Sequence, residues 1–338
     1  MILTRILQIL CLLLGVLRLG QAQDRHFSQQ YATRLHLNPA YAGIHADYSA
    51  ILTYRNQWPS LNGAFVTNQF AGYYRLKNES TSVGLVMALD KAGAVGLSNF
   101  QIGGIYAYQA IINENLAFSA GMQLSYGSQS VDYSELIFGD QLLEDGTTNP
   151  NSLEPYRYDP AHYVSAEAGG ILYNNSFWVS LSAYHLNQPD IGFNFTSKLK
   201  AKYLLNGGYK FVLNKYYYLN KPYERSITPS LTYMHQGNFK KMDAGLYTTI
   251  TPITLGVLYR GLPVFSEYGY DHAVVLIAGI VLDPIKIGYS YDVPVSALGA
   301  NTGGAHEVSL SFEKINYNKI FKKRVSGKNY KRIACPAF

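Results

Sequence analysis

The sequence predicts an all-β protein: a transmembrane antiparallel β-barrel of about 14 strands with an N-terminal extension and a basic C-terminal tail. Three observations lead to this prediction. Strands have alternating apolar and polar faces, connections alternate between short and long, and the first residues resemble a secretory signal peptide. The 338 residues include 30 Tyr and 30 Gly, and only 15% are charged, which is typical of a β-rich and aromatic-rich protein.

Residues 1–22 have the three parts of a secretory signal peptide, with a basic start, an apolar stretch and a small-x-small cleavage site ending at Ala22. The apolar stretch over residues 6–17 is too short for a membrane-anchoring helix, and Arg18 ends it. We therefore expect an exported chain that begins at Gln23. It would retain Cys335 alone, which excludes an internal disulfide.

Residues 23–46 form an N-terminal extension ahead of the first strand. Residues 23–44 show no sustained hydrophobic periodicity. Asn38-Pro39 is a turn-initiating pair, because Asn hydrogen-bonds to its own backbone and Pro fixes φ. Gly43 offers a left-handed backbone position or a close approach. The extension either fixes the entry of the chain into the barrel or contacts a partner.

Residues 115–127 show the alternation of faces most clearly. Leu124 belongs to the apolar face and Gln123 to the small or polar face. The stretch exceeds the roughly 9–11 residues that a tilted strand needs to cross a bilayer, whereas soluble strands average about 5–6. Strands are expected within residues 47–316 at 47–58, 65–76, 81–90, 97–112, 115–131, 163–173, 176–186, 195–213, 225–235, 241–250, 253–261, 271–282, 285–292 and 306–316.

The connections between these strands alternate in length, as in outer-membrane barrels, where short periplasmic turns face longer outer loops. The short connections are 77–80, 113–114, 174–175, 251–252 and 283–284, and the long ones are 59–64, 91–96, 132–162, 187–194, 262–270 and 293–305. Two break the rule, because 214–224 is long for a turn and 236–240 is short for a loop. The even number of strands places both ends of the barrel on the periplasmic side.

Charged residues within the strands predict which face lines the lumen. A Lys facing lipid at the bilayer midplane costs about 2–4 kcal/mol, so such residues face the lumen or lie near a rim. The candidate lumen-facing residues are Lys198, Lys200, Lys202 and Arg260. Arg55, Arg75, Gln101, Gln123, Glu167, Asp243 and Lys286 share the inward register.

The longest loop, residues 132–162, carries seven acidic residues and one Arg. A solvated surface loop explains this charge, and the spacing of Asp140, Glu144 and Asp145 does not match an EF-hand. Long outer loops also recognise partners or fold into the lumen.

The basic tail, residues 317–338, contains no acidic residue. In an exported barrel it lies in the periplasm, which excludes nucleic acid as its partner. An acidic periplasmic protein or lipid headgroups are the alternatives, beside a plainly solvated tail. Its candidate basic patch comprises Lys322, Lys323, Arg324, Lys331 and Arg332.

Two stretches of the extension, Phe27-Ser28-Gln29 and residues 37–43, resemble the N-terminal signature of the PorP/SprF family, and the tail ending at Phe338 is similar to tails in that family. The candidate family-motif and partner-contact residues are Phe27, Ser28, Gln29, Asn38, Pro39, Ala40, Tyr41 and Gly43. The resemblance spans the mature chain in length and strand count.

This resemblance implies an outer-membrane protein of the type IX secretion and gliding machinery of Bacteroidetes. It implies a barrel that helps secrete or anchor surface cargo, such as adhesins with a C-terminal sorting domain. The expected partners are that sorting domain, outer-membrane lipids, and an OmpA-like peptidoglycan-binding protein or another periplasmic component.

Neither an enzyme nor a cofactor site is predicted. The eight His are scattered, and no metal motif, phosphate loop or nucleophile elbow occurs. Ser182 and His185 lie on opposite faces of their strand, which argues against a catalytic dyad, and His185 is expected at the membrane interface. The alternative function is a diffusion channel of the long-chain fatty-acid transporter type, with residues 23–44 as a plug.

Overall fold

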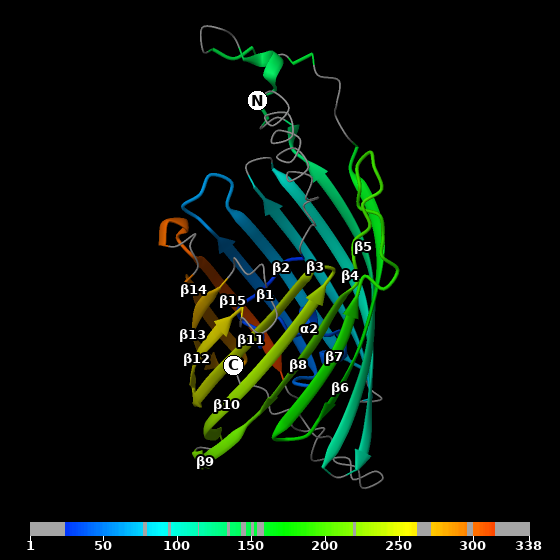
Figure 1. The fold of residues 1–338 in the computed structure, drawn as a ribbon. Helices are drawn as coiled ribbons and strands as arrows, with labels where there is room; N and C mark the ends of the chain where they lie inside the picture. Colours follow the sequence, from blue (N-terminus) through cyan, green and yellow to red (C-terminus); the bar gives the residue numbers. More distant parts are fainter. Residues whose placement is uncertain are drawn as a thin grey trace, which may run out of the picture.

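The structure is a computed structural model that describes residues 24–76, 80–93, 96–113, 115–133, 136–142, 147–149, 152–153, 159–218, 221–261, 272–295 and 300–314. The predicted signal peptide and basic tail lie outside these residues. Within them, fifteen strands form one antiparallel sheet that closes on itself, because β15 pairs with β1 and β10 pairs with β11 (Figure 1).

The bounds of the strands follow the hydrophobic alternation. They are β1 (Tyr48–Gln57), β2 (Phe65–Arg75), β3 (Thr81–Ala92), β4 (Leu97–Asn113), β5 (Leu116–Val131), β6 (Ala161–Tyr173), β7 (Phe177–Tyr184), β8 (Lys202–Tyr209), β9 (Phe211–Tyr218), β10 (Lys221–Gln236), β11 (Phe239–Ile250), β12 (Ile253–Arg260), β13 (Ala273–Leu282), β14 (Ile285–Pro294) and β15 (Ala305–Lys314). Short helical elements are α2 (Arg34–Leu37), η1 (Pro39–Tyr41), η3 (Gly139–Gln141) and η4 (Ala300–Thr302).

The fourteen-stranded barrel predicted from the sequence is confirmed. β8 and β9 follow one another and both pair with β10, so they share one of fourteen positions around the wall. In the described residues, no helix is long and apolar enough to cross a membrane.

The short connections gather at one end of the barrel, the turn end, and the long ones at the other, the loop end (Figure 1). β1 begins and β15 ends at the turn end, because Tyr48 pairs with Lys314. The predicted long connection at 214–224 is wrong: β9 continues to Tyr218 and β10 begins at Lys221, so this turn is tight too.

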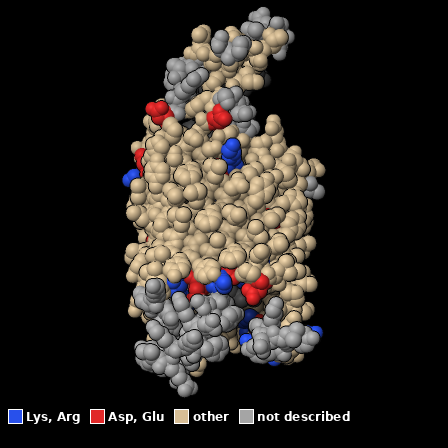
Figure 2. Space-filling model, turned by 180° about the vertical axis from the view of Figure 1, so that it is seen from behind, with Lys and Arg blue, Asp and Glu red and all other residues tan. Residues whose placement is uncertain are grey.

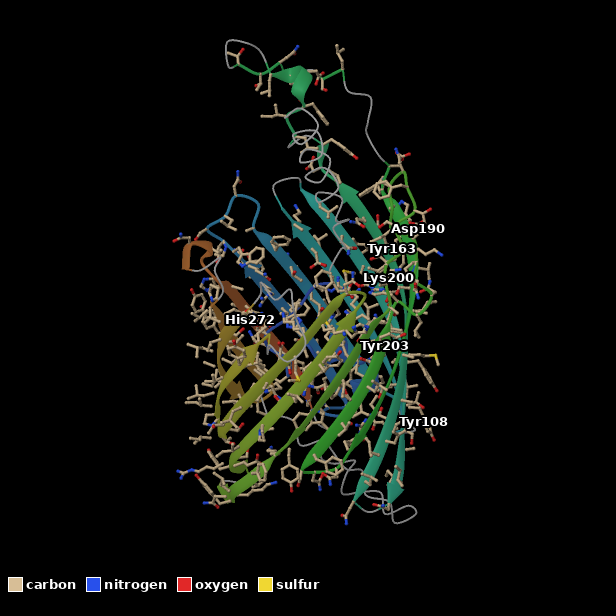
Figure 3. The ribbon with its side chains drawn as sticks, viewed as in Figure 1. Tyr108, Tyr163, Asp190, Lys200, Tyr203 and His272 are labelled. Atoms are coloured by element: carbon tan, nitrogen blue, oxygen red, sulfur yellow. The ribbon has the colours of Figure 1, made fainter. Side chains whose placement is uncertain are left out.

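The expected strand 195–213 also needs correction, because β8 begins only at Lys202. The Asp190 carboxylate accepts the backbone N–H groups of Gly192 (3.0 Å) and Ser197 (2.8 Å), which folds the preceding loop. Lys198 and Lys200 lie in this loop with exposed side chains, and Figure 3 shows Asp190 and Lys200 towards the loop end.

The outer face of the wall is apolar. Leu124 is 64% exposed and Gln123 is 7% exposed, as the alternation of β5 predicts. Tyr108 and Tyr203 also face outwards, from β4 and β8 (Figure 3). Figure 2 shows a broad band of surface without Lys, Arg, Asp or Glu between charged residues nearer the two ends. This band is the surface that meets the hydrocarbon of a bilayer.

We expect Leu124→Arg to destabilise the inserted barrel by about 2–4 kcal/mol, because the guanidinium would face lipid. The matched control is Gln123→Arg, whose side chain would point into the lumen near Glu167. Heat-modifiable mobility of the folded barrel on gels, measured across a urea series in vesicles, compares the two. Equal midpoints for both variants would contradict the assignment of the faces.

Candidate functional site

The N-terminal segment, residues 24–46, lies inside the barrel and is called the plug below. It starts towards the loop end, where Arg25 bonds to Asp90 of β3 (2.9 Å) and Gln101 of β4. It ends at the turn end, where the backbone N–H of Ala46 donates to the Tyr73 hydroxyl (3.2 Å). Residues 27–35, 38–44 and 46 are buried. The plug therefore fills the lumen along most of its length.

The local fold of the plug follows from its sequence. The Asn38 side chain accepts the backbone N–H of Ala40 (2.9 Å), and Pro39 is the first residue of η1. Gly43 has φ +79°, and a Cβ there would lie 1.9 Å from the Ser82 hydroxyl. The turn at Asn38-Pro39 and the left-handed position at Gly43 are both as the sequence predicts.

The motif at residues 38–41 is seated against β5 to β8. Asn38 donates through Nδ2 to the carbonyls of Gly170 (3.2 Å) and Leu181 (3.0 Å). The Tyr41 hydroxyl donates to the Asn206 side chain (3.1 Å), which also accepts Trp178 Nε1 (2.8 Å). Asn38 and Tyr41 thus bind the motif to the barrel wall.

Two glycines of the wall lack the side chain that would otherwise occupy the space of the motif at residues 38–41. A Cβ at Gly121 would lie 2.4 Å from the backbone N of Ala40. A Cβ at Gly169 would lie 2.2 Å from Asn38 Oδ1. Since real atoms do not approach this closely, any larger residue at either position would collide with the seated plug.

Ser28 lies in a buried charge cluster on the other side of the lumen. Its hydroxyl donates to Asp292 of β14 (2.7 Å) and accepts from Arg55 of β1 and Arg260 of β12 (both 2.7 Å). Asp292 also pairs directly with Arg55 (2.7 Å) and Arg260 (2.5 Å). All four side chains are buried, and Arg55 also pairs with the buried Glu307 (3.1 Å), so the plug hydroxyl joins a network of four charges at low dielectric.

Glu307 of β15 holds the plug backbone beside this cluster. Its carboxylate accepts the N–H groups of Ser28 (2.7 Å) and Gln29 (2.9 Å), and its carbonyl accepts Gln29 Nε2 (2.8 Å). Gln29 Oε1 in turn accepts the Tyr31 hydroxyl (2.8 Å). The predicted motif residues Ser28 and Gln29 thus join the start of the chain to the last strand.

Phe27, the first residue of this motif, is 3% exposed and makes an edge-to-face ring contact with His36 (5.1 Å between ring centroids). The Phe27 ring thus packs within the plug, whereas Ser28 and Gln29 bond to the barrel wall.

Asp24 anchors the outer end of the plug. Its carboxylate pairs with Lys202 of β8 (2.5 Å) and His185 (2.9 Å). Burial raises the pKa of Asp24, but Lys202 and His185 outweigh burial and hold this pKa well below its ordinary value. His185 is 4% exposed and also bonds to Ser165 (2.8 Å). The expectation of an interfacial His185 is therefore wrong, because its ring is drawn inwards by these partners.

Burial lowers the pKa of two plug histidines. Burial, with the neighbouring charges of Lys241 and Arg260, lowers the pKa of His26 to about 3. Burial also lowers the pKa of His36 well below its ordinary value, helped by Lys202. Neutral His26 lies 3.2 Å from the Asp243 carboxylate, so it serves as a hydrogen-bonding group there.

A cavity of about 580 Å³ lies between the plug and the loop end, and we call it the vestibule. Asp24, Arg25 and His26 of the plug line it together with wall residues that include Trp58, Tyr163 and Phe239. Trp58 follows β1 and Phe239 begins β11, both at the loop end. The vestibule is therefore a recess lined by aromatic, amide and charged groups, with the plug at its bottom.

The structure places the predicted site residues in different settings. Lys202 and Arg260 line the lumen with ion-paired side chains, whereas Lys198 and Lys200 are exposed in the loop. The candidate basic patch, Lys322, Lys323, Arg324, Lys331 and Arg332, lies outside the described residues.

Three acidic partners in the lumen were not predicted from the sequence: Asp24, Asp292 and Glu307. The inward register of Arg55 and Arg260 was the available signal, because buried charges need counter-charges. Their acidic partners are distant in the sequence, so the sequence does not predict which carboxylate pairs with which arginine.

A family model described as "Type IX secretion system membrane protein PorP/SprF" matches residues 19–312. Among solved structures, the chain is similar to the CymD monoaromatic hydrocarbon channel, with 12% identity, a TM-score of 0.43, and coverage of 88% of this chain and 96% of that one. A Pseudomonas aeruginosa FadL homologue gives 12% identity, a TM-score of 0.41, and coverage of 82% and 92%. KdgM porin gives 9% identity, a TM-score of 0.35, and coverage of 78% and 98%. No curated protein matches the chain.

Proposed function

Because the chain belongs to the PorP/SprF family of type IX secretion system membrane proteins, we propose that it is a sealed, non-enzymatic outer-membrane barrel that holds exported cargo at the cell surface. The cargo would carry a C-terminal sorting domain, and the cell would be a Bacteroidetes-type bacterium. The observation that carries the proposal is the plug, which is buried along most of its length and bonded to the wall on several sides.

The orientation of the barrel supports a cargo site at the loop end. Short turns face the periplasm in outer-membrane barrels, and longer loops face the outside. The vestibule then opens outwards and ends on the plug. A recess of this kind can receive a segment of a surface protein, with Trp58 and Phe239 as apolar contacts and the amides of Asn99 and Gln101 as hydrogen-bonding groups.

A diffusion channel is the second candidate, and the vestibule is the feature that favours it. The plug argues against free diffusion, because solute would have to displace a segment held by buried charges and by hydrogen bonds to β5, β6, β14 and β15.

In the family's secretion machinery, a periplasmic component such as an OmpA-like peptidoglycan-binding protein would contact the turn end.

Two assays on the purified full-length protein distinguish the candidates: solute entry into liposomes that contain it, and retention of a tagged sorting domain on beads that carry it. We expect solute entry no faster than in protein-free liposomes, with a general porin as positive control. We expect the beads to retain the sorting domain. Trp58→Ala combined with Phe239→Ala should weaken that retention by about tenfold or more, since interface aromatics contribute about 2 kcal/mol or more each.

The matched control is Ile253→Ala, which removes an exposed apolar side chain at the turn end and should leave retention unchanged. Solute entry at the porin's rate without sorting-domain retention would replace the proposal with the channel.

A further inference from the structure

β9 has one open edge. It pairs with β10 along one side, and among the described residues no strand pairs with the other side. β7 pairs with β8 only as far as Phe177 opposite Tyr209, and the Lys210 N–H then donates to the Ser176 carbonyl (2.6 Å). β9 therefore continues past the turn between β6 and β7, at the turn end of the barrel (Figure 1).

Both faces of β9 are open as well. Phe211 (52%), Val212 (48%), Leu213 (66%) and Tyr216 (49%) are all exposed, although neighbours in a strand point to opposite faces. In β8, by contrast, buried and exposed residues alternate from Lys202 to Asn206. The strand thus has unpaired backbone groups beside apolar side chains on each face.

Natural barrels and sheets usually protect such an edge with short length, proline, charged side chains, β-bulges or covering segments. β9 is eight residues long and has no proline; its one charged residue is Lys215, and its pairing with β10 has a register shift at Arg225 and Ser226. Its hairpin with β10 is held in a fixed arrangement, because Tyr216 stacks on Tyr223 (5.4 Å between centroids, 10° between planes). An edge that is extended, ordered by a partner strand and unpaired among the described strands is a template for one more strand.

The charged residues around the edge of β9 indicate the charge of a strand that could pair with it. Lys215 and Arg225 are exposed, and the Glu224 carboxylate already pairs with Lys210 (2.5 Å). A second copy of β9 placed antiparallel on the first, with Lys215 opposite Lys215, would bring like charges together, which is unfavourable. An acidic strand would meet complementary charge.

We propose that the free edge of β9 binds an extended segment of a periplasmic partner, which adds as a further strand and carries acidic side chains between apolar ones. Main-chain hydrogen bonds supply the affinity, and the apolar and basic side chains of β9 supply the selectivity. This site lies at the opposite end from the vestibule, so its test needs neither cargo nor the secretion machinery.

The probe is a synthetic peptide of about eight residues that alternates Val and Glu, added to the purified full-length protein. Fluorescence anisotropy should show binding of this peptide. The same peptide with Lys in place of Glu, or with alternate amides N-methylated, should bind about tenfold more weakly or worse, because it loses charge complementarity or main-chain hydrogen bonds.

Lys215→Glu should weaken binding of the Val–Glu peptide by about tenfold and strengthen binding of the Val–Lys peptide. Lys198→Glu, an exposed site in the loop before β8, is the matched control and should change neither. Heat-modifiable mobility on gels verifies that both variants remain folded.

The position is tested by Asn214→Cys in a Cys335→Ser background, which should form a disulfide with a cysteine-bearing Val–Glu peptide. Ile253→Cys, at the same end on a strand with both edges paired, should not. Equal binding of the acidic and basic peptides, full binding of the N-methylated peptide, or disulfides between two copies at position 214 would each overturn the proposal.

Discussion

Gly121→Val opens the lumen to small solutes. A side chain at Gly121 would collide with the backbone of Ala40, which a Cβ would approach to 2.4 Å, and η1 has no flexible group there that can yield. Overpacking of this kind costs about 1–3 kcal/mol or more, and the plug relieves it by leaving its seat. We expect liposomes with the variant to swell in solutes that do not enter liposomes with the wild type.

Gly169→Val should act in the same way, because a Cβ there would lie 2.2 Å from Asn38 Oδ1. The matched control is Gly104→Val on β4, whose Cβ would meet no atom within 4 Å. If Gly104→Val causes the same swelling, the leak reflects damage to the wall. If Gly121→Val is folded and still sealed, the seat of the plug is assigned wrongly.

Asp292→Asn lowers the free energy of unfolding by about 3–5 kcal/mol, the range for breaking a buried ion pair by removing one partner. Asp292 pairs with both Arg55 and Arg260, and its loss leaves two buried guanidinium groups short of a carboxylate. The measurement is the urea midpoint of the folded band on gels, with protein in vesicles.

Asp190→Asn is the control for this substitution, since Asp190 is exposed and its carboxylate bonds to groups of its own loop, among them the N–H groups of Gly192 and Ser197. Its midpoint should equal that of the wild type. An unchanged midpoint for Asp292→Asn would mean that the cluster around Ser28 contributes little to holding the plug.

The barrel wall could be predicted because period-two patterning decides which residue meets lipid. Leu124 and Gln123 are adjacent and have opposite environments, and no long-range information is needed to distinguish them. The turn at Asn38-Pro39 and the conformation of Gly43 were likewise local, since each depends on the backbone preferences of one or two residues.

The contents of the lumen could not be predicted in the same way. Ser28 of the plug meets Asp292 of β14, and Asp24 of the plug meets Lys202 of β8, only once the wall has closed around the plug. Lys198 and Lys200 continue the alternation of β8 in sequence, yet a capping interaction at Asp190 removes them from the wall. Alternation alone does not show where a loop folds back on itself.

The contacts of the plug with β15 have a consequence for biogenesis. Arg34 pairs with Glu313, and Glu307 holds Ser28 and Gln29, so the plug, which is synthesised before the wall, binds β15, the last of the described strands to be synthesised. A polypeptide that ends before β15 lacks these anchors and also lacks one of the two strands that pair with β1. The seating of the plug and the closure of the wall thus both depend on β15.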